Sequence, residues 1–291
     1  MNRLPRIPDP GPDDWAALLS EWGEPRFRAG QVFRWVAGRG VLDPQAMSDL
    51  SRDSRRGLSE TFDTSEPDLT WSRDPGSETE KVLVRFADGD AVEAVLIMEG
   101  TRTTTCLSTQ VGCPVGCRFC ASGLLGLRRN LSRGEILDQF IVIRRRAAEL
   151  GRRISNVVMM GMGEPLLNYE ATLGALDVLN HPEGGGIGAR HLTVSTIGLR
   201  KGIERLREEG RQYTLAISLH APDDETRRRI VPFAGAMRVA ELADAARAWL
   251  DGTGREVTFE YVLLEGVNAA PQHARQLASL LEGVQGTVNL I

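Results

Sequence analysis

Three cysteines lie within eight residues of this chain, in the stretch Cys-Pro-Val-Gly-Cys-Arg-Phe-Cys that ends at Cys120. Thiolates are the usual protein ligands of iron–sulfur clusters, and Cys113, Cys117 and Cys120 could hold three corners of a cubane cluster. The fourth iron would then have no protein ligand and would be free to bind another molecule. Phe119 adds an apolar wall that could shield such a cluster from water.

The cysteines also admit other interpretations. Cysteines that are simply buried hydrophobes rarely gather in this way, and four cysteines in 291 residues without a secretory signal do not indicate a disulfide scaffold. Zinc is the stronger alternative, because Cys106 could complete a four-thiolate site. Structural zinc sites usually contain two separated Cys-x-x-Cys pairs, whereas only Cys117 and Cys120 have that spacing. The spacing therefore favours an iron–sulfur cluster and leaves zinc open.

The three-cysteine spacing, with an aromatic residue before the last cysteine, resembles the signature of the radical S-adenosylmethionine (SAM) enzymes. The resemblance implies a 4Fe–4S cluster whose open iron chelates the amino and carboxylate groups of SAM. It also implies that an electron from the cluster cleaves SAM to give a 5'-deoxyadenosyl radical.

The bulk properties are those of an ordinary globular protein. Of the 291 residues, 42% are hydrophobic and 25% are charged, and no apolar run approaches the roughly 20 residues that span a membrane. The length suits one large domain, or a small domain attached to a barrel-sized one. Because no signal peptide is visible, we expect a cytoplasmic location, where thiols stay reduced.

Positive charge gathers around and after the cysteines, although the net charge of the chain is -4. Residues 99–153 hold 10 basic and 4 acidic side chains. Arg128, Arg129, Arg133 and the run Arg144–Arg146 could therefore meet RNA phosphates near a reaction centre. The run could equally be a solvated helix face, because arginine is the main cation of the whole chain.

The amino-terminal third divides into a helical part and a hairpin. In about the first sixty residues, apolar residues recur at helical spacing. Two strand-like runs follow, Lys81–Phe86 and Ala91–Met98, and the Asp88-Gly89 pair between them is a hairpin turn signal. We expect a helical accessory domain in residues 1–62 and a β-hairpin linker in residues 63–98.

From residue 99 onward strands and helices alternate, which favours a parallel sheet with helical crossovers. The predicted strands are Thr103–Ser108, Asn156–Met160, His191–Ser195, Thr214–Leu219, Glu256–Leu264 and Thr287–Ile291. The predicted helices between them are Ser132–Leu150, Tyr169–Leu179, Leu199–Glu209, Val239–Leu250 and Pro271–Leu281. Together they predict an α/β fold, a partial (β/α)6 barrel, over residues 99–291.

Polar segments follow or end the first four barrel strands. The cysteines follow the first strand, Gly163 and Glu164 follow the second, Ser195 ends the third, and Ser218-Leu219-His220 ends the fourth. Because ligands of such sheets bind at the carboxyl ends of strands, we expect these segments to face one cavity. Glu164, in a glycine-flanked turn, could accept a hydrogen bond from an ammonium group. Taken alone, His220 is interpreted as a satisfied loop histidine.

Longer stretches around these residues make the resemblance specific. They are Cys-Leu-Ser-Thr-Gln-Val-Gly-Cys from Cys106, Gly-Leu-Arg-Arg-Asn-Leu from Gly126, Gly-Met-Gly-Glu-Pro-Leu-Leu-Asn from Gly161, Val-Ser-Thr from Val194, Ser-Leu-His from Ser218, and Phe-Arg-Ala-Gly-Gln from Phe27 with Trp35. In order and kind they are similar to those of the radical SAM adenosine C2-methyltransferases of ribosomal and transfer RNA, over nearly the whole chain.

This resemblance implies an RNA substrate, and we also expect a monomer and a one-electron reductant such as flavodoxin or ferredoxin. Glu93 matches the base that removes the C2 proton, and Cys106 matches the cysteine that releases the product by forming a disulfide. A carboxylate among apolar strand neighbours tends to have a raised pKa, which would suit Glu93 for proton transfer. The implied SAM contacts are Gly163, Glu164, Ser195, Ser218, Leu219 and His220.

The chain departs from the family pattern at its carboxyl end. The methyl-carrying cysteine of the family lies beyond the sixth predicted strand, whereas this sequence ends within that strand and has no fifth cysteine. We therefore expect a fragment of a longer protein, or a divergent relative that forms the radical without this methyl transfer. A zinc-stabilised four-cysteine RNA-binding protein and a radical SAM enzyme with another substrate are the alternative functions. These motifs do not separate C2 from C8 of adenine as the target.

Overall fold

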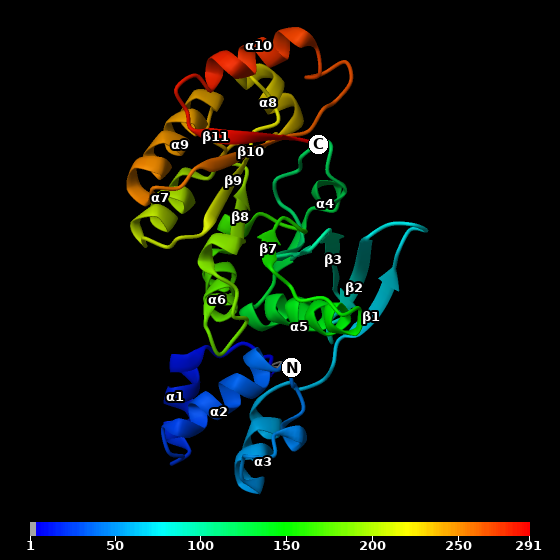
Figure 1. Ribbon diagram of the computed structural model, residues 1–291, viewed down its shortest axis with the longest axis vertical. Coiled ribbons are helices and arrows are strands. Elements are labelled where there is room, and N and C mark those ends of the chain that lie inside the picture. The colour runs from blue at the N-terminus through cyan, green and yellow to red at the C-terminus, as the bar shows by residue number, and fades with distance from the viewer. Residues whose placement is uncertain (1–3) are drawn as a thin grey trace. The chain divides into compact units, whose positions relative to one another are not determined.

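The computed structural model describes residues 4–291 (Figure 1). The chain forms two compact units, each built from segments that are separate in sequence. The first unit holds the described residues up to Thr109, Asn130–Val157 and Glu170–Gly188. The second unit holds Gln110–Arg129, Val158–Tyr169 and Ala189–Ile291. Within residues 4–291, no helix is long and apolar enough to cross a membrane.

The amino-terminal part of the first unit is helical, as the periodicity predicts. Trp15 and Leu19 on the first helix are buried, and the Trp15 ring lies 5.1 Å from that of Phe62. This packing stabilises helices that are too short to persist alone in water. The elements are α1 (Pro12–Glu21), α2 (Phe27–Phe33) with a following π-helical turn (Arg34–Gly38), a 3-10 turn (Pro44–Ala46) and α3 (Arg52–Thr61).

The predicted hairpin is present and belongs to a larger antiparallel sheet in the first unit. Its strands pair in the order β1 (Asp68–Ser72), β2 (Thr79–Arg85), β3 (Ala91–Glu99) and β4 (Arg102–Cys106). Side chains alternate between the faces, and one face buries Val82, Val84, Val92, Ala94 and Leu96. The other face carries the half-buried and exposed residues of β2 and β3. Strand β1 is short and mostly exposed, and it was not predicted.

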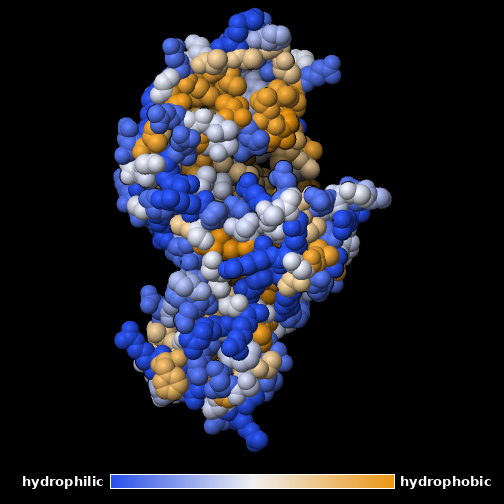
Figure 2. All heavy atoms as spheres, in the orientation of Figure 1, coloured by the Kyte–Doolittle hydropathy of each residue, from blue (hydrophilic) through white to orange (hydrophobic). Residues whose placement is uncertain are grey.

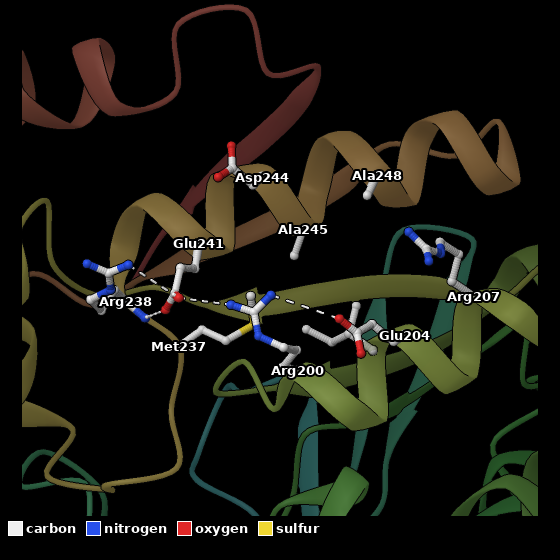
Figure 3. Close-up of a pocket in the computed structure, with 10 residues that line it drawn as sticks. Arg200, Glu204, Arg207, Met237, Arg238, Glu241, Asp244, Ala245 and Ala248 are labelled. Atoms are coloured by element: carbon white, nitrogen blue, oxygen red, sulfur yellow. Dashed lines mark hydrogen bonds and ion pairs between the residues drawn. The ribbon is translucent and has the colours of Figure 1, made fainter.

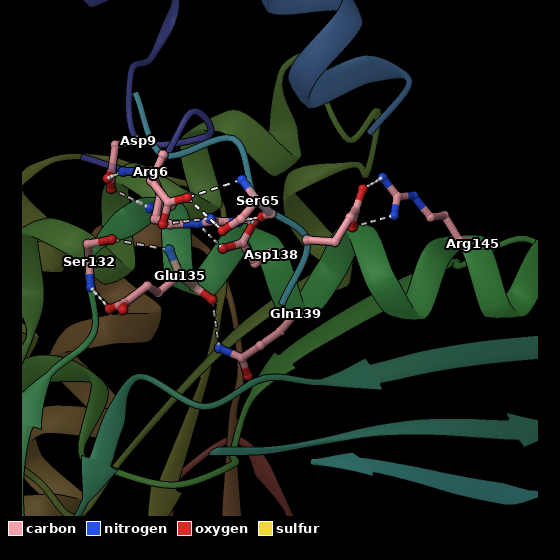
Figure 4. A network of polar contacts seen from close by, with 11 residues as sticks. Arg6, Asp9, Ser65, Ser132, Glu135, Asp138, Gln139 and Arg145 are labelled. Carbon is pink, nitrogen blue, oxygen red and sulfur yellow. Dashed lines mark hydrogen bonds and ion pairs between the residues drawn. The ribbon is translucent and has the colours of Figure 1, made fainter. Parts of the chain in front are cut away.

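Helix α5 (Arg133–Glu149) fixes the segment before α1 through a buried polar network (Figure 4). Ser132 and Glu135 form the predicted capping box, with Ser132 N donating to Glu135 Oε2 at 3.0 Å. One turn later, Asp138 accepts from Arg6 Nε at 2.8 Å and from Arg6 Nη2 at 3.1 Å. Arg6 is 5% exposed and Asp138 is fully buried. Removing Arg6 would cost about 3–5 kcal/mol, because it would leave the buried Asp138 carboxylate without its charged partner. Arg6 itself has a second ion-pair partner, Asp63, at 3.0 Å.

The basic run at the end of α5 is bound by its own unit. Arg146 donates from Nε and Nη2 to the two carboxylate oxygens of buried Glu80, at 2.6 and 3.0 Å. Arg144 donates to the Ala37 carbonyl oxygen, and Arg145 pairs with Glu66. All three arginines of the run thus have partners within their own unit, while Arg145 remains 41% exposed. Phosphate contact by the run would require these bonds to break.

The second unit contains the parallel part of the predicted barrel. β8 (Leu192–Thr196), β9 (Thr214–Ser218), β10 (Val257–Tyr261) and β11 (Gly286–Leu290) pair side by side in parallel. The helices that connect them are α7 (Arg200–Glu208), α9 (Val239–Thr253) and α10 (Pro271–Leu280). An additional short helix, α8 (Asp224–Ile230), follows β9 and was not predicted. Figure 2 shows apolar side chains gathered around β10 and β11, where Leu263, Leu290 and Ile291 are exposed.

The remaining elements agree with the predictions or flank the cysteines. β7 and α6 begin at their predicted first residues and differ from the predicted ends by one residue. β5 and β6 form a separate two-stranded sheet, and α4 follows the last cysteine. The bounds are β5 (Gln110–Gly112), α4 (Ala121–Leu124), β6 (Leu127–Asn130), β7 (Asn156–Met159), α6 (Tyr169–Asn180), and the 3-10 turns Pro165–Leu167 and Ala189–His191.

Candidate functional site

The three cysteines lie in the loop between β5 and α4 of the second unit, and all are free thiols. Cys113 N donates to the Gly126 carbonyl oxygen at 3.0 Å, and Cys120 N donates to the Cys117 carbonyl oxygen at 3.1 Å. Gly112, at the start of the loop, has φ +76°, and a Cβ there would lie 1.8 Å from the Gly126 oxygen. Only glycine fits this close approach of the two chain segments, which shapes the loop.

A cavity of about 230 Å³ lies beside this loop. The three cysteines and Phe119 form part of its lining. The structure thus brings the cysteines together with segments from the carboxyl ends of β7, β8 and β9, as the strand-end rule predicts. The residues that these segments contribute include Gly161, Gly163, Glu164, Ser195, Ser218 and His220.

Glu164 is a buried carboxylate in this cavity, with 3% exposure. Its Oε1 accepts from Leu166 N at 3.0 Å, and its Oε2 accepts from Ile197 N at 2.9 Å. Burial raises the pKa of Glu164 to about 7, against the opposing effect of these two N–H donors. The Thr196 side chain also hydrogen-bonds to Glu164, so three of its roughly four acceptor positions are occupied. The remaining position can accept a hydrogen bond from an ammonium group.

Gly163 sets the position of Glu164. Its φ is +105°, and a Cβ there would lie 2.7 Å from the Gln110 Cβ and 2.9 Å from the Gln110 nitrogen. Gln110 Oε1 in turn accepts from Glu164 N at 2.9 Å. A side chain at position 163 would therefore displace Gln110 and, with it, the backbone of Glu164.

His220 is buried and neutral. Its Nδ1 accepts from Val262 N at 3.1 Å, which assigns the ring proton to Nε2. Burial lowers the pKa of His220 to about 4. The ring packs edge-on against Phe119, with 4.7 Å between the ring centroids. His220 is thus a satisfied histidine, as first interpreted, that also contributes to the cavity wall.

The structure changes the predicted residue set at two positions. Leu219 is fully buried and is not among the residues that line the cavity, although its N–H donates to the Glu260 carbonyl oxygen. Glu260, which sequence analysis missed, lines the cavity, and its Oε2 accepts from Asn289 Nδ2 at 2.7 Å. A carboxylate between Phe259 and Tyr261 in strand β10 was the available signal.

The thiols fit a cluster better than a single metal ion. Among the described residues, no three His, Cys, Asp or Glu side chains converge closely enough to hold one metal ion. A zinc site requires four ligands about 2.3 Å from one ion when all are thiolates. A cubane cluster needs less convergence, because each of its three cysteines binds a different iron. The cysteine loop therefore suits a 4Fe–4S cluster.

Burial also acts on the thiols themselves. It raises the pKa of Cys117 to about 12 and raises that of Cys113. Neighbouring thiols act in the same direction, whereas the positive charge of Arg227 lowers the pKa of Cys117. Iron coordination selects the thiolate form, so a loaded site places several negative charges in this buried region.

Glu93 and Cys106 lie in the first unit, on the sheet face opposite the buried one. Cys106 is directly across from Val95 in the β3–β4 register, and Glu93 is two residues before Val95. The two side chains therefore share one face. Glu93 is 47% exposed, and its Oε1 lies 2.8 Å from Lys81 Nζ. The apolar surroundings expected for Glu93 are thus wrong, because neighbours such as Val92 point to the other face.

A second hollow, of about 400 Å³, lies between α7 and α9 of the second unit (Figure 3). Its charged side chains neutralise one another. Glu241 Oε1 lies 2.9 Å from Arg200 Nη2 and 3.4 Å from Arg238 Nη2. The lining contains no cysteine or histidine. We interpret it as a charged surface groove between two helices, and not as a reaction site.

Two family models match the chain. Residues 107–278 match the radical SAM superfamily. Residues 12–63 match the ribosomal RNA large subunit methyltransferase N-terminal domain. The first match contains the cysteine loop and nearly all of the cavity lining, and the second covers α1 to α3.

Curated relatives and a solved structure agree over most of the chain. A probable dual-specificity RNA methyltransferase RlmN of Symbiobacterium thermophilum is 48% identical over 99% of this chain and 78% of its own length. The protein of the same name from Dictyoglomus thermophilum is 44% identical over 96% of this chain and 80% of its own length. The crystal structure of a radical SAM methyltransferase from Sphaerobacter thermophilus matches with a TM-score of 0.93 at 43% identity, covering 98% of this chain and 84% of that one.

Proposed function

We propose that this chain, which belongs to the radical SAM superfamily and within it to the RlmN family of RNA methyltransferases, methylates C2 of adenosine in RNA. The cavity of the second unit is the observation that supports this proposal most. It combines three free cysteines with a buried carboxylate, two serines and a neutral histidine. A zinc-stabilised RNA-binding protein would need none of the groups other than cysteine.

In this proposal, Cys113, Cys117 and Cys120 hold the cluster. When bound, the cluster and SAM supply a 5'-deoxyadenosyl radical. Phe119, packed against His220, keeps water away from the cysteine side of the cavity. This exclusion of water protects a reactive radical from side reactions.

The other cavity residues bind and orient SAM. Glu164 accepts a hydrogen bond from the amino group of SAM, and Gly163 lets the backbone approach it closely. Ser195 and Ser218 donate hydroxyl hydrogen bonds to the carboxylate or the ribose. His220 contributes an Nε2–H donor, because its Nδ1 is already an acceptor. Together these groups would hold SAM in one orientation. Such positioning of the bond to be cleaved accounts for much of the rate enhancement in enzymes.

We assign the later steps to Glu93 and Cys106. The Glu93 carboxylate takes the C2 proton of an adduct in which C2 is joined to the methylene carbon of the family's methyl-carrying cysteine, a residue that is not among the four cysteines of this sequence. The Cys106 thiolate then attacks the sulfur of that cysteine: the S–S bond forms, the S–C bond breaks, and the released carbon takes up a proton to become the methyl group. Their shared face of the antiparallel sheet supports a joint role. The ammonium group of Lys81, 2.8 Å from Glu93, holds the carboxylate in place on this face.

The partners follow from the same proposal. We expect ribosomal and transfer RNA as substrates, since the relatives are named as dual-specificity RNA methyltransferases. A one-electron reductant of the flavodoxin or ferredoxin class would reduce the cluster. We also propose that the protein is a monomer of the cytoplasm, where both RNA and reductant are present.

Anaerobic reconstitution tests the proposal. Reduction of the iron- and sulfide-loaded protein in the presence of SAM should yield 5'-deoxyadenosine. Incubation of the gene product with transfer RNA or a fragment of 23S ribosomal RNA should yield 2-methyladenosine, identified by mass spectrometry of the nucleosides. Appearance of 8-methyladenosine instead would move the target to C8. A fully loaded cluster that forms no 5'-deoxyadenosine, or one zinc per chain without iron, would contradict the proposal.

A further inference from the structure

Arg227 is a buried arginine for which the proposed chemistry has no role so far. It lies on α8, the short helix that begins after Asp223, whose Oδ1 accepts from Thr226 N at 2.8 Å. Its exposure is 4%. Burying a guanidinium is costly unless its charge and its N–H groups are compensated. The partners of Arg227 therefore indicate what the residue does.

The guanidinium donates four hydrogen bonds, and all four end on backbone carbonyl oxygens of the second unit. Nη2 donates to Ile197 O at 2.5 Å and to Ser218 O at 3.1 Å. Nε donates to Leu219 O and Nη1 donates to Met237 O, both at 3.1 Å. The side chain thus ties the end of β9 to the segment that follows β8. Ser218 ends β9 and Ser195 is the next-to-last residue of β8, and both line the cavity.

The charge of Arg227 has no carboxylate partner within ion-pair distance in the described part of the chain. Carbonyl oxygens satisfy its N–H groups and leave its full positive charge in place. Asp224, an acidic residue on the same helix, accepts a hydrogen bond from Val239 N and does not pair with Arg227. A buried and unneutralised cation of this kind requires a negative group nearby to be stable.

The cysteine loop would supply such a negative group once its thiolates bind iron. Ile230 at the end of α8 accepts from Arg118 N at 2.9 Å, and Ile230 and Val231 pack against Cys113 and Cys117. Arg227 lies on the same helix as Ile230, three residues before it, so α8 carries both the guanidinium and the residues that pack on the cysteine loop. Thiolates bound to iron would therefore lie within the electrostatic reach of the buried guanidinium.

We propose that Arg227 is a positioning residue with two functions: its buried charge raises the reduction potential of the cluster, and its hydrogen-bonding fork holds the strand ends that bind SAM. The inference rests on the proposed function, since it needs a redox-active cluster on the three cysteines. One-electron reduction adds negative charge to the cluster. A nearby fixed cation in a region of low dielectric favours that reduced state.

Two substitutions separate the two functions. Arg227→Met removes the charge and the fork, whereas Arg227→Lys keeps the charge and loses the planar fork that reaches four carbonyls. Arg228→Met is the matched control, because Arg228 is the exposed neighbour on the same helix. Iron and sulfide content of each reconstituted holoprotein is measured first. The midpoint potential is then measured by redox titration followed by electron paramagnetic resonance, and the SAM dependence of 5'-deoxyadenosine formation is measured last.

For Arg227→Met we expect the ratio of reduced to oxidised cluster at a given applied potential to fall about tenfold, or about 59 mV for a one-electron couple. For Arg227→Lys we expect a potential close to that of the wild type and a KM for SAM raised about tenfold. Arg228→Met should change neither quantity.

The outcomes distinguish this inference from the proposed function. A wild-type protein that loads no redox-active cluster would contradict the proposed function itself. A normal wild type with an unchanged potential in loaded Arg227→Met would overturn the charge function alone. If Arg227→Met does not incorporate the cluster, the Arg227→Lys variant decides the question. A midpoint potential below that of the wild type, despite the retained charge, would overturn the inference. A wild-type potential together with a raised KM for SAM would support it.

Discussion

We assign chemistry to two regions, the cavity of the second unit and the open sheet face of the first unit. Each contains one key carboxylate, Glu164 in the cavity and Glu93 on the sheet face, and the two differ in burial and in hydrogen-bond partners. Glu164 lies in the second unit with 3% exposure, and two backbone N–H groups fix its oxygens. Glu93 lies on an open sheet face of the first unit with 47% exposure, and a single flexible lysine holds it. Backbone donors cannot move without the fold, whereas a lysine can exchange its partner. The first arrangement suits a small cofactor bound in one pose, and the second suits a large substrate that docks and leaves.

The cavity and the sheet face also differ in how much their polar contacts contribute to stability. The buried groups of the cavity are costly to strip of partners, because water cannot replace a lost hydrogen bond there. The exposed ion pair on the sheet face contributes little to stability, because both charges are well hydrated when separated. Mutations in the cavity should therefore lower the stability of the fold and weaken cofactor binding. Mutations on the sheet face should lower catalysis and change stability little.

The largest effect should follow the loss of a cavity cysteine. We expect Cys117→Ala to lose the cluster and all 5'-deoxyadenosine formation, because two thiolates hold a cubane cluster poorly. Iron analysis and the absorbance of the cluster measure this loss. Cys106→Ala on the sheet face is the control, and it should keep full iron content and SAM cleavage. If Cys106→Ala also lost the metal, the four-cysteine zinc alternative would gain support.

The next largest effect concerns Glu164. In Glu164→Ala the N–H groups of Leu166 and Ile197 lose their acceptor in a buried position, which should lower the free energy of unfolding by about 2 kcal/mol. Binding of SAM should weaken as well, because the amino group loses its carboxylate. Denaturant unfolding and equilibrium dialysis with SAM measure the two effects. A variant as stable as the wild type would show that the two N–H groups find other acceptors.

Two glycines test the same contrast at the level of the backbone. Gly163 and Gly89 both have positive φ, +105° and +85°, but a Cβ meets Gln110 at position 163 and open space at position 89. Gly89→Ala should cost only the strain of the conformation, about 1 kcal/mol. Gly163→Ala should lower the free energy of unfolding by more than this. It should also weaken SAM binding, because a displaced Gln110 would shift the Glu164 backbone that is hydrogen-bonded to it. Thermal unfolding of both variants measures the difference, and equal losses would contradict the packing argument.

The smallest effect on stability should come from the Lys81–Glu93 pair. Lys81→Met should change the free energy of unfolding by less than about 1 kcal/mol, because the pair is nearly half exposed. Glu93 raises the pKa of Lys81, so the small contribution is present at neutral pH and disappears as the pH rises through that raised pKa. Urea unfolding at neutral pH and above pH 10 checks this sign. A contribution that grows with rising pH would contradict it.

Much of the fold follows from local pattern. Helices such as α6 and α9 begin at the residues that the apolar periodicity and the breaks before them predict, Tyr169 and Val239. The strand ends likewise indicate which polar residues meet. Elements with little apolar content, such as β1 and α8, escape this kind of prediction, because their stability comes from the partners they pack on.

The candidate site shows the same limit. The cysteines, Gly163 and Glu164 were predictable, because their types and spacing carry the chemistry. Glu260 and Arg227 were not, because a single carboxylate or arginine has no pattern and becomes informative only when its neighbours are known.

The sequence by itself determined the kind of chemistry, since three cysteines at this spacing and a glycine-flanked glutamate specify donors by type and order. Only the tertiary structure decided the surroundings of each group. It pairs Arg146 with Glu80 and leaves Glu93 exposed. It also buries the Leu219 side chain, and it places the guanidinium of Arg227 on carbonyl oxygens at the strand ends. The physical reason is that donor type is a local property of the chain. Burial, charge pairing and reach depend on residues brought together from distant positions by folding.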